Sequence, residues 1–89
     1  MWLVYIVQCA DGTYYTGLTE NLEERIGRHN TGNGAKYTKL KRPVRLVYCE
    51  ECLSKVQAIK REIEIKKLSH RNKEYLIRFG KRVSLATKL

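Results

Sequence analysis

The chain has 89 residues, enough for one domain with a modest core but too few for a second domain that would select a substrate. Lysine and arginine number 18 against 9 aspartate and glutamate, so the formal charge is +9, which favours a polyanionic partner such as nucleic acid. A solvated lysine-rich surface would give the same charge, so the function has to be argued from motifs.

The first segment, residues 1–10, is apolar but has no basic leader and is far too short to span a bilayer. We interpret it as a buried strand and expect a cytoplasmic protein with no membrane partner. The three cysteines Cys9, Cys49 and Cys52 form no even disulfide framework, as expected of reduced thiols. Cys49-x-x-Cys52 also permits a zinc or redox interpretation, but no second pair of ligands completes a zinc site, and the alternative is that these are small core residues.

The predicted elements begin with a hairpin. Strands over residues 2–9 and 13–18 flank Asp11-Gly12, a typical turn sequence. A helix then begins after Asn21, with Glu24 at the N3 position of a capping box, and glycines at 32 and 34 end it. Pro43 opens a third strand over residues 44–52, because proline is tolerated at the first residue of a strand.

Two helices complete the chain. Ser54 and Gln57 cap the first of them, which runs to about Leu68, and the second begins at Ser69 or His70 and ends near residue 80. The predicted order is therefore ββαβαα. We expect residues 1–80 to form the domain and residues 81–89 to be a frayed tail.

The loop of the hairpin decides which side chains share a face of the sheet. A two-residue loop would place Tyr5 and Tyr15 on opposite faces. A three-residue loop over residues 10–12, with Gly12 left-handed, pairs Tyr5 with Gly17 and puts both tyrosines on one face. A glycine opposite Tyr5 would leave room above that ring for a ligand. The alternative is that both tyrosines are ordinary residues of an amphipathic sheet.

Arg25 and His29 are spaced i, i+4 and project from one side of the first predicted helix. The planar guanidinium of arginine binds phosphate in a bidentate manner, and a neutral histidine can orient a phenol or relay a proton. The alternative is a surface Arg25 paired with Glu23 or Glu24 and a half-buried His29.

The second predicted helix carries a carboxylate on its apolar side. On a helical wheel Glu62 lies between two apolar edges, formed by Val56, Ile59 and Ile63 on one side and by Ala58 and Ile65 on the other. Glu62 is either paired with Lys66 at i+4, or holds a metal ion whose other ligands are water and phosphate oxygens.

Taken in order, these residues resemble the GIY-YIG nuclease superfamily. Leu3-Val4-Tyr5 stands where the family has GIY and Tyr15-Thr16-Gly17 where it has YIG, while residues 21–29 and 58–62 are similar to its first helix and to its metal-binding helix. Residues 35–38, 42–44 and 46–48 resemble the small stand-alone bacterial members, which are little more than the nuclease domain. The similarity covers residues 2 to about 79, and a more distant one extends to the catalytic modules of excision-repair and junction-cutting nucleases.

The resemblance implies an α+β fold in which a small three-stranded antiparallel sheet is flanked by helices. It also implies a metal-dependent endonuclease that hydrolyses phosphodiester bonds, with DNA as the expected substrate and DNA repair or recombination as the setting. One Mg²⁺ or Mn²⁺ ion would be held by Glu62. Tyr15, in preference to Tyr5, would take a proton from the attacking water, Arg25 would offset charge on the phosphate, and His29 would hydrogen-bond the base or the water.

A basic segment that also carries an aromatic ring is the expected nucleic-acid contact. We assign this role to Lys36, Tyr37, Lys39, Lys41, Arg42 and, from the second helix, Lys66. Two alternatives remain open at this point: a binding module that kept the fold without turnover, and a nuclease subunit that depends on a protein partner for targeting.

Overall fold

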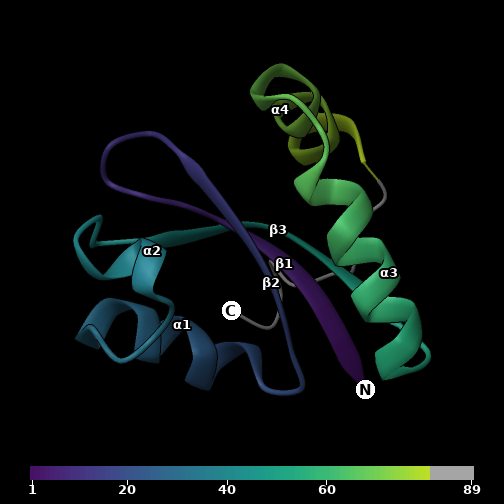
Figure 1. Cartoon of the computed structure of the whole chain (residues 1–89), viewed down its shortest axis with the longest axis horizontal. Coiled ribbons are helices and arrows are strands. Elements are labelled where there is room, and N and C mark those ends of the chain that lie inside the picture. Colours follow the sequence, from purple (N-terminus) through teal and green to yellow (C-terminus); the bar gives the residue numbers. More distant parts are fainter. Residues whose placement is uncertain (81–89) are drawn as a thin grey trace.

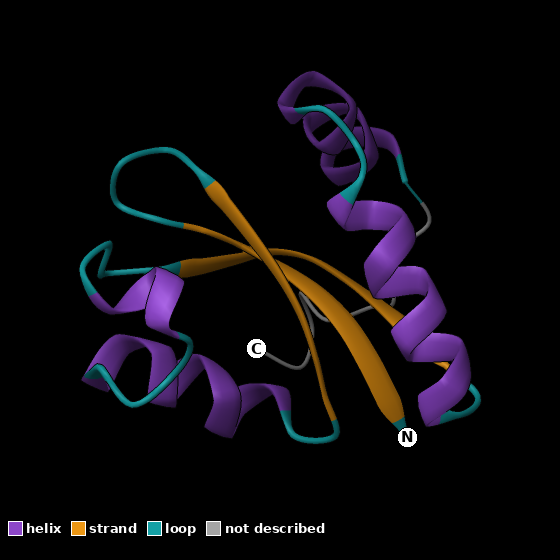
Figure 2. Cartoon of the chain, in the orientation of Figure 1, coloured by secondary structure: helices purple, strands orange, loops and turns teal. Residues whose placement is uncertain are grey.

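The N-terminal hairpin forms two of the three strands of the sheet. In a computed structural model, which describes residues 1–80, β1 (Trp2–Gln8) pairs antiparallel with β2 (Tyr14–Thr19). On its other side β1 pairs antiparallel with β3 (Arg45–Cys52), so the strand order is β2-β1-β3 and β1 is central. Figures 1 and 2 show the three strands crossing the middle of the molecule. The predicted three-stranded antiparallel sheet is confirmed.

The register of the hairpin follows the three-residue loop. The Cys9 N–H donates to the Thr13 carbonyl oxygen at 2.8 Å, and Gly12 adopts φ +87°, which only glycine adopts at little cost. Tyr5 is consequently opposite Gly17. Tyr5 and Tyr15 belong to the same apolar cluster, so they share a face as predicted, and the two-residue loop is wrong.

Two of the helices begin at the predicted caps, Asn21 and Ser54, and a third begins at His70, one of the two predicted starts, with Ser69 as its cap. Asn21 accepts from the Glu24 N–H at the start of α1 (Leu22–Thr31), and Ser54 and Ser69 cap α3 (Lys55–Lys66) and α4 (His70–Phe79) in the same way. Each cap satisfies one of the N–H groups that a helix leaves unpaired at its first turn.

A further helix, α2 (Lys36–Lys39), is absent from the predicted order. It is a single turn without a side-chain cap, and so it carries neither the capping signal nor the periodicity by which longer helices are recognised. The observed order is therefore ββααβαα.

The helices lie on both faces of the sheet, with α1 and α2 on one side and α3 and α4 on the other (Figure 1). Each face has its own apolar cluster. The cluster under α1 contains Tyr5, Val7, Cys9, Leu22, Val44 and Cys49. The cluster under α3 contains Val4, Ile6, Tyr48, Cys52, Ala58 and Ile65.

Cys49 and Cys52 fall in different clusters, on opposite faces of β3. Residues three apart in a strand point away from each other, so these two thiols do not face one ion or form a redox pair. Both are buried and free, as is Cys9. The small-core interpretation of the cysteines therefore holds. Within the described residues, no helix is long and apolar enough to cross a membrane. The predicted tail, residues 81–89, lies outside the described residues.

The wheel predicted for α3 is partly wrong. Ala58 and Ile65 are fully buried, but Val56, Ile59 and Ile63 are exposed. The helix meets the sheet along a narrow line, since Ala58 and Ile65 lie seven residues, about two turns, apart on the same side. Its apolar edge at Val56, Ile59 and Ile63 therefore faces away from the core.

Candidate active site

The centre of the candidate site is a buried contact between a strand and a helix. The Tyr5 phenol oxygen of β1 lies 2.8 Å from Nε2 of His29 on α1, a hydrogen-bonding distance. Both residues are 1% exposed. Arg25 is one turn earlier on α1, so the predicted i, i+4 pair does direct His29 against the sheet, and His29 is fully buried rather than half-buried.

The second nitrogen of His29 is bonded as well. Its Nδ1 lies 2.8 Å from the Thr38 hydroxyl oxygen, and that hydroxyl donates to the Ala35 carbonyl oxygen at 2.9 Å. Thr38 is on α2 and is fully buried. The single-turn helix thus closes a chain of hydrogen bonds that runs from the sheet through the imidazole to its own backbone.

Gly17 serves Tyr5 in a different way from the one expected. A Cβ atom at residue 17 would come within 2.5 Å of the Tyr5 phenol oxygen. The space above the glycine is therefore filled by the Tyr5 phenol, and the predicted room for a ligand is wrong. Lack of a side chain at Gly17 instead lets the phenol reach His29 across β2.

Burial and nearby charge perturb both partners of this pair. The pKa of Tyr5 is raised, mainly because burial disfavours the phenolate, with Tyr15 and Glu62 adding to the effect and Arg25 opposing it. The pKa of His29 is lowered below its ordinary value, chiefly by burial and next by the Arg25 guanidinium. His29 is consequently the neutral imidazole at neutral pH.

Tyr15 and Arg25 line the same region. The Tyr15 ring meets the His29 ring edge to face, with 5.3 Å between the ring centres. Arg25 is partly exposed, and no ion pair involves it among residues 1–80, so pairing with Glu23 or Glu24 is not seen. Its guanidinium is therefore available to a phosphate.

Glu62 approaches from the other layer. The preceding residue on α3 is Arg61, whose guanidinium binds the Glu50 carboxylate of β3 at 2.7 Å. Arg61 and Glu62 therefore both lie near the contact between α3 and the sheet. Glu62 pairs with Lys66 at 3.5 Å and its side chain is 18% exposed. Lys66 Nζ lies 6.0 Å from the Tyr15 ring centre, which places this flank of α3 beside β2, an edge strand.

Three of the predicted nucleic-acid contacts lie at this site. Tyr37 stacks on Tyr15 with 5.8 Å between ring centres, and Lys41 Nζ lies 4.4 Å from the centre of the Tyr37 ring. Lys66 is the third. Lys36 and Lys39 are exposed on α2, and Arg42 donates to the Lys39 carbonyl oxygen at 2.8 Å. α2 therefore gathers these basic side chains next to the tyrosines.

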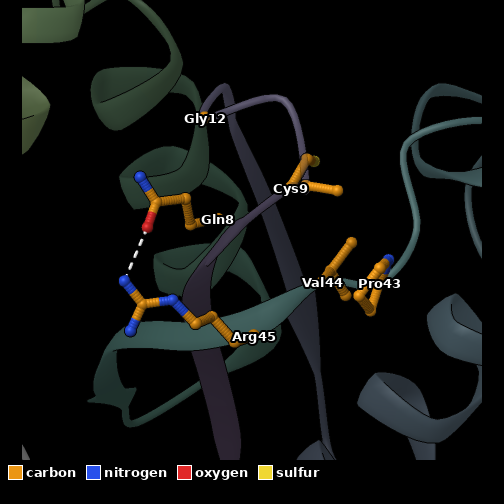
Figure 3. Close-up of a pocket in the computed structure, with 7 residues that line it drawn as sticks. Gln8, Cys9, Gly12, Pro43, Val44 and Arg45 are labelled. Carbon is orange, nitrogen blue, oxygen red and sulfur yellow. Dashed lines mark hydrogen bonds between the residues drawn. The ribbon is translucent and has the colours of Figure 1, made fainter.

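A separate hollow of about 380 Å³ lies where the hairpin loop meets the start of β3 (Figure 3). Cys9, Pro43 and Val44 face it, and an Arg45–Gln8 hydrogen bond of 2.7 Å borders it. Burial raises the pKa of the Cys9 thiol, which keeps the sulfur neutral. The residues that line this hollow include no acid paired with a base.

Sequence reasoning missed Thr38 as a member of the site. Thr38 stands between Tyr37 and Lys39 in a segment predicted as a loop, where no periodicity or spacing marks it, and its role depends on a fold that brings it nine residues back to His29. Gly34 was predicted only as a helix end, yet a Cβ there would approach His29 Nδ1 to 2.5 Å. Only the three-dimensional structure reveals either contact.

Comparison with known proteins gives a consistent result. The family model of the GIY-YIG catalytic domain matches residues 1–75. UPF0213 protein DP2720 of Desulfotalea psychrophila is 54% identical over 78 residues, covering 86% of this chain and 71% of that protein. UPF0213 protein SSP2268 of Staphylococcus saprophyticus is 53% identical over 77 residues, covering 86% and 94%.

Among solved structures, the solution NMR structure of UPF0213 protein BH0048 from Bacillus halodurans is similar with a TM-score of 0.56 and 46% identity, covering 86% of this chain and 83% of that one. Its identity and coverage agree with those of the sequence relatives. This chain belongs to the GIY-YIG family, among its small UPF0213 proteins.

Proposed function

We propose that the protein is a metal-dependent endonuclease that hydrolyses phosphodiester bonds in DNA. The observation that carries the proposal is the buried Tyr5–His29 hydrogen bond of 2.8 Å, within range of the Glu62 and Arg25 charges. A phenol joined to a neutral imidazole, next to a carboxylate and a cation, is a set that can move a proton and bind a phosphate. Membership of a nuclease family supports the same reaction class.

In this proposal Tyr5 is the proton relay. Its oxygen takes a proton from the attacking water while its own proton passes to His29 Nε2, and the hydroxide oxygen bonds to phosphorus as the leaving oxygen departs. The leaving oxygen, on the opposite side of phosphorus, takes its proton from solvent, and His29 gives up the proton it holds through Tyr5 after the product has left. Tyr5 is a better candidate than Tyr15, because no hydrogen bond within residues 1–80 gives the Tyr15 hydroxyl a base that could receive its proton.

The other residues bind and orient. Arg25 offsets the charge that builds up on the phosphate, since its guanidinium is partly exposed and has no carboxylate partner among the described residues. Tyr15, packed edge to face against His29, helps to position the water. Because Tyr5 is buried, the water that it deprotonates has to be enclosed between the protein and the substrate.

Glu62 is the residue that would hold the metal ion. Its donor set suits Mg²⁺ or Mn²⁺, because such ions are commonly held by one or two carboxylates together with substrate phosphates and water. Within residues 1–80 no cluster of three or more His, Cys, Asp or Glu side chains gathers, so in this proposal the substrate and water would supply the other ligands. When bound, a single ion would offset the negative charge of the phosphate. Lys66 would then leave its ion pair with Glu62 and bind a phosphate of the substrate.

The basic residues around α2 support nucleic acid as the substrate. Tyr37, stacked on Tyr15, leads from the site to the cations of α2, and the chain as a whole carries a charge of +9. We assign the activity to the cytoplasm, because three buried free thiols suit a reducing compartment. We also propose that a protein partner supplies substrate targeting.

Cleavage tests the proposal directly. Purified protein is incubated with Mg²⁺ or Mn²⁺ and labelled single-stranded, duplex and branched DNA, with matching RNA, beside Glu62→Gln. The control is Glu64→Gln, because Glu64 is on the same helix but pairs with Arg61 at 3.7 Å on the other flank. We expect metal-dependent products that disappear with Glu62→Gln and persist with Glu64→Gln. Salt-sensitive binding by all three proteins without products would instead identify a binding module.

A further inference from the structure

We propose that Thr38 is a positioning residue that fixes His29 in the tautomer with its proton on Nδ1, which leaves Nε2 free to receive the proton of Tyr5. The tautomer is inferred from the hydrogen-bond geometry at His29, Thr38 and Ala35, for a neutral imidazole. Its consequence for catalysis rests on the proposed function, in which Tyr5 gives its proton to His29.

The assignment follows from counting hydrogens along the chain of bonds. A carbonyl oxygen can only accept, so the hydrogen of the Thr38 hydroxyl is the one that lies between Thr38 and Ala35, where the oxygens are 2.9 Å apart. A hydroxyl has no second hydrogen to offer. The 2.8 Å contact between Thr38 and His29 is therefore donated by Nδ1–H.

The other nitrogen is then determined. A neutral imidazole carries one N–H, so with the hydrogen on Nδ1 the Nε2 atom is an acceptor. The 2.8 Å contact with Tyr5 is consequently donated by the phenol. The three hydrogens therefore point in one direction, from Tyr5 through His29 and Thr38 to the Ala35 carbonyl oxygen, which accepts the last of them.

Burial makes this direction hard to reverse. Tyr5, His29 and Thr38 are 1%, 1% and 0% exposed, so bulk water cannot replace any of these partners. The opposite tautomer would leave Nδ1 and the Thr38 oxygen facing each other without a hydrogen between them, unless Thr38 gave up Ala35. In that case the 2.9 Å bond from the Thr38 hydroxyl to the Ala35 carbonyl oxygen would be lost, and that carbonyl would keep only the Thr38 N–H, at 3.1 Å.

The backbone holds the imidazole in the same orientation. A Cβ at Gly34 would lie 2.5 Å from His29 Nδ1 and 2.8 Å from its Cα, so the chain passes directly against the ring on its way into α2. Lowering of the His29 pKa by burial and by Arg25 supports the neutral form that the hydrogen count assumes. The cation formed when His29 accepts a proton keeps its Nδ1–H bond to Thr38, so the same hydroxyl serves both states.

The experiment is a two-bond ¹H–¹⁵N correlation spectrum of the protein labelled with ¹⁵N-histidine. The chain has two histidines, and the second, His70, is exposed, stacks on Tyr14 and lies 3.6 Å from Glu74, so it provides an internal reference for a ring outside the buried site. We expect His29 to show protonated Nδ1 and unprotonated Nε2 in the wild type. Thr38→Ser should keep this pattern, and Thr38→Val should lose it because the methyl that replaces the hydroxyl cannot accept.

A wild-type His29 with its proton on Nε2 would overturn the inference, as would a Thr38→Val protein that keeps the wild-type pattern. The spectra need no substrate, so they test the tautomer independently of nuclease activity. Where the tautomer is as expected but no substrate is cut, the tautomer assignment holds and the proposed function fails.

Cleavage supplies the second measurement. For Thr38→Val we expect kcat to fall by about 100-fold, the lower end of what proton transfer by a positioned side chain contributes, with KM unchanged because Thr38 lies behind His29. Thr16→Val is the matched control, because Thr16 is also a buried threonine but lies outside this chain of bonds. Thr38→Ser should restore kcat. A rise in KM with an unchanged kcat would contradict a positioning role.

Discussion

Buried threonines on the two faces of the sheet differ in the hydrogen bonding of their hydroxyls. On the α1 side the Thr38 hydroxyl bonds both His29 and Ala35, and both of its contacts are shorter than 3.0 Å. Thr16 lies on β2 and is also buried, but its hydroxyl has no hydrogen-bond partner within the described residues. Tyrosines differ in the same way: Tyr5 bonds an imidazole, whereas Tyr48 under α3 bonds the Glu50 carboxylate.

This contrast distinguishes a polar network from an ordinary core. Under α3 the polar atoms at the margin are joined as an ion pair, where Arg61 contacts both oxygens of Glu50, and Tyr48 adds to it. Opposite charges that satisfy each other hold a fixed structure. Under α1 a neutral acid and a neutral base meet instead, and such a pair can exchange a proton without first breaking a salt bridge.

Removing each phenol in turn should give the largest difference between the faces. Tyr5→Phe removes the proposed relay, so kcat for cleavage should fall by about 10²–10⁴-fold. Tyr48→Phe should leave kcat unchanged, because Arg61 still holds Glu50. Single-turnover cleavage measures both. Equal losses in the two variants would show that the faces do not differ in function.

Acid should inactivate the α1 face first. Protonated His29 cannot accept from Tyr5, so the rate should fall about tenfold per pH unit below the folded-state pKa of His29, which burial holds under the ordinary value of about 6.5. Stability has the same sign: between these two pKa values the unfolded chain binds a proton that the native protein does not, so stability falls as pH falls.

Rate and urea titrations at several pH values measure both quantities. His29→Gln should remove the contribution of this group to the pH dependence of stability. A wild-type rate that already falls with decreasing pH well above 6.5 would contradict a depressed pKa.

Two glycines test how tightly the α1 face is packed. Gly17→Ala places a Cβ 2.5 Å from the Tyr5 phenol oxygen, so the ring has to move from His29, and we expect a loss of about 1–3 kcal/mol in the free energy of unfolding. Gly27→Ala is the control, because nothing lies within 4 Å of a Cβ on that exposed side of α1. It should stabilise by about 0.5–1 kcal/mol. Urea unfolding distinguishes these opposite signs.

Local signals in the sequence predicted most of the fold. Caps at Asn21, Ser54 and Ser69 mark three helices, and the loop around Gly12 sets the hairpin register, since each depends on residues close in the chain. α2 escaped prediction because one turn without a cap has no local signal. The exposed apolar edge of α3 was wrongly placed, because a wheel shows which residues share a side but not how wide a surface the sheet offers.

The candidate site was predictable only as far as its residues stand in motifs. The register brings Tyr5 and Tyr15 together, and spacing puts Arg25 and His29 on one side of a helix. Spacing could not show that the Tyr5 ring fills the space above Gly17, because that depends on where the phenol lies relative to α1. Thr38 was beyond reach for a related reason: its partner is set by the path of the chain through residues 32–35.

The smallest expected effect compares the two threonines by one substitution. Thr16→Val removes a buried hydroxyl that has no partner, so the free energy of unfolding should rise by about 1 kcal/mol. Thr38→Val is similar in size and burial but leaves His29 Nδ1–H without an acceptor, so the free energy should fall. Urea unfolding of both variants at neutral pH measures this. If both substitutions stabilise, the α1 face is packed like any core, and the hydrogen bonds of Thr38 do not hold His29 in place.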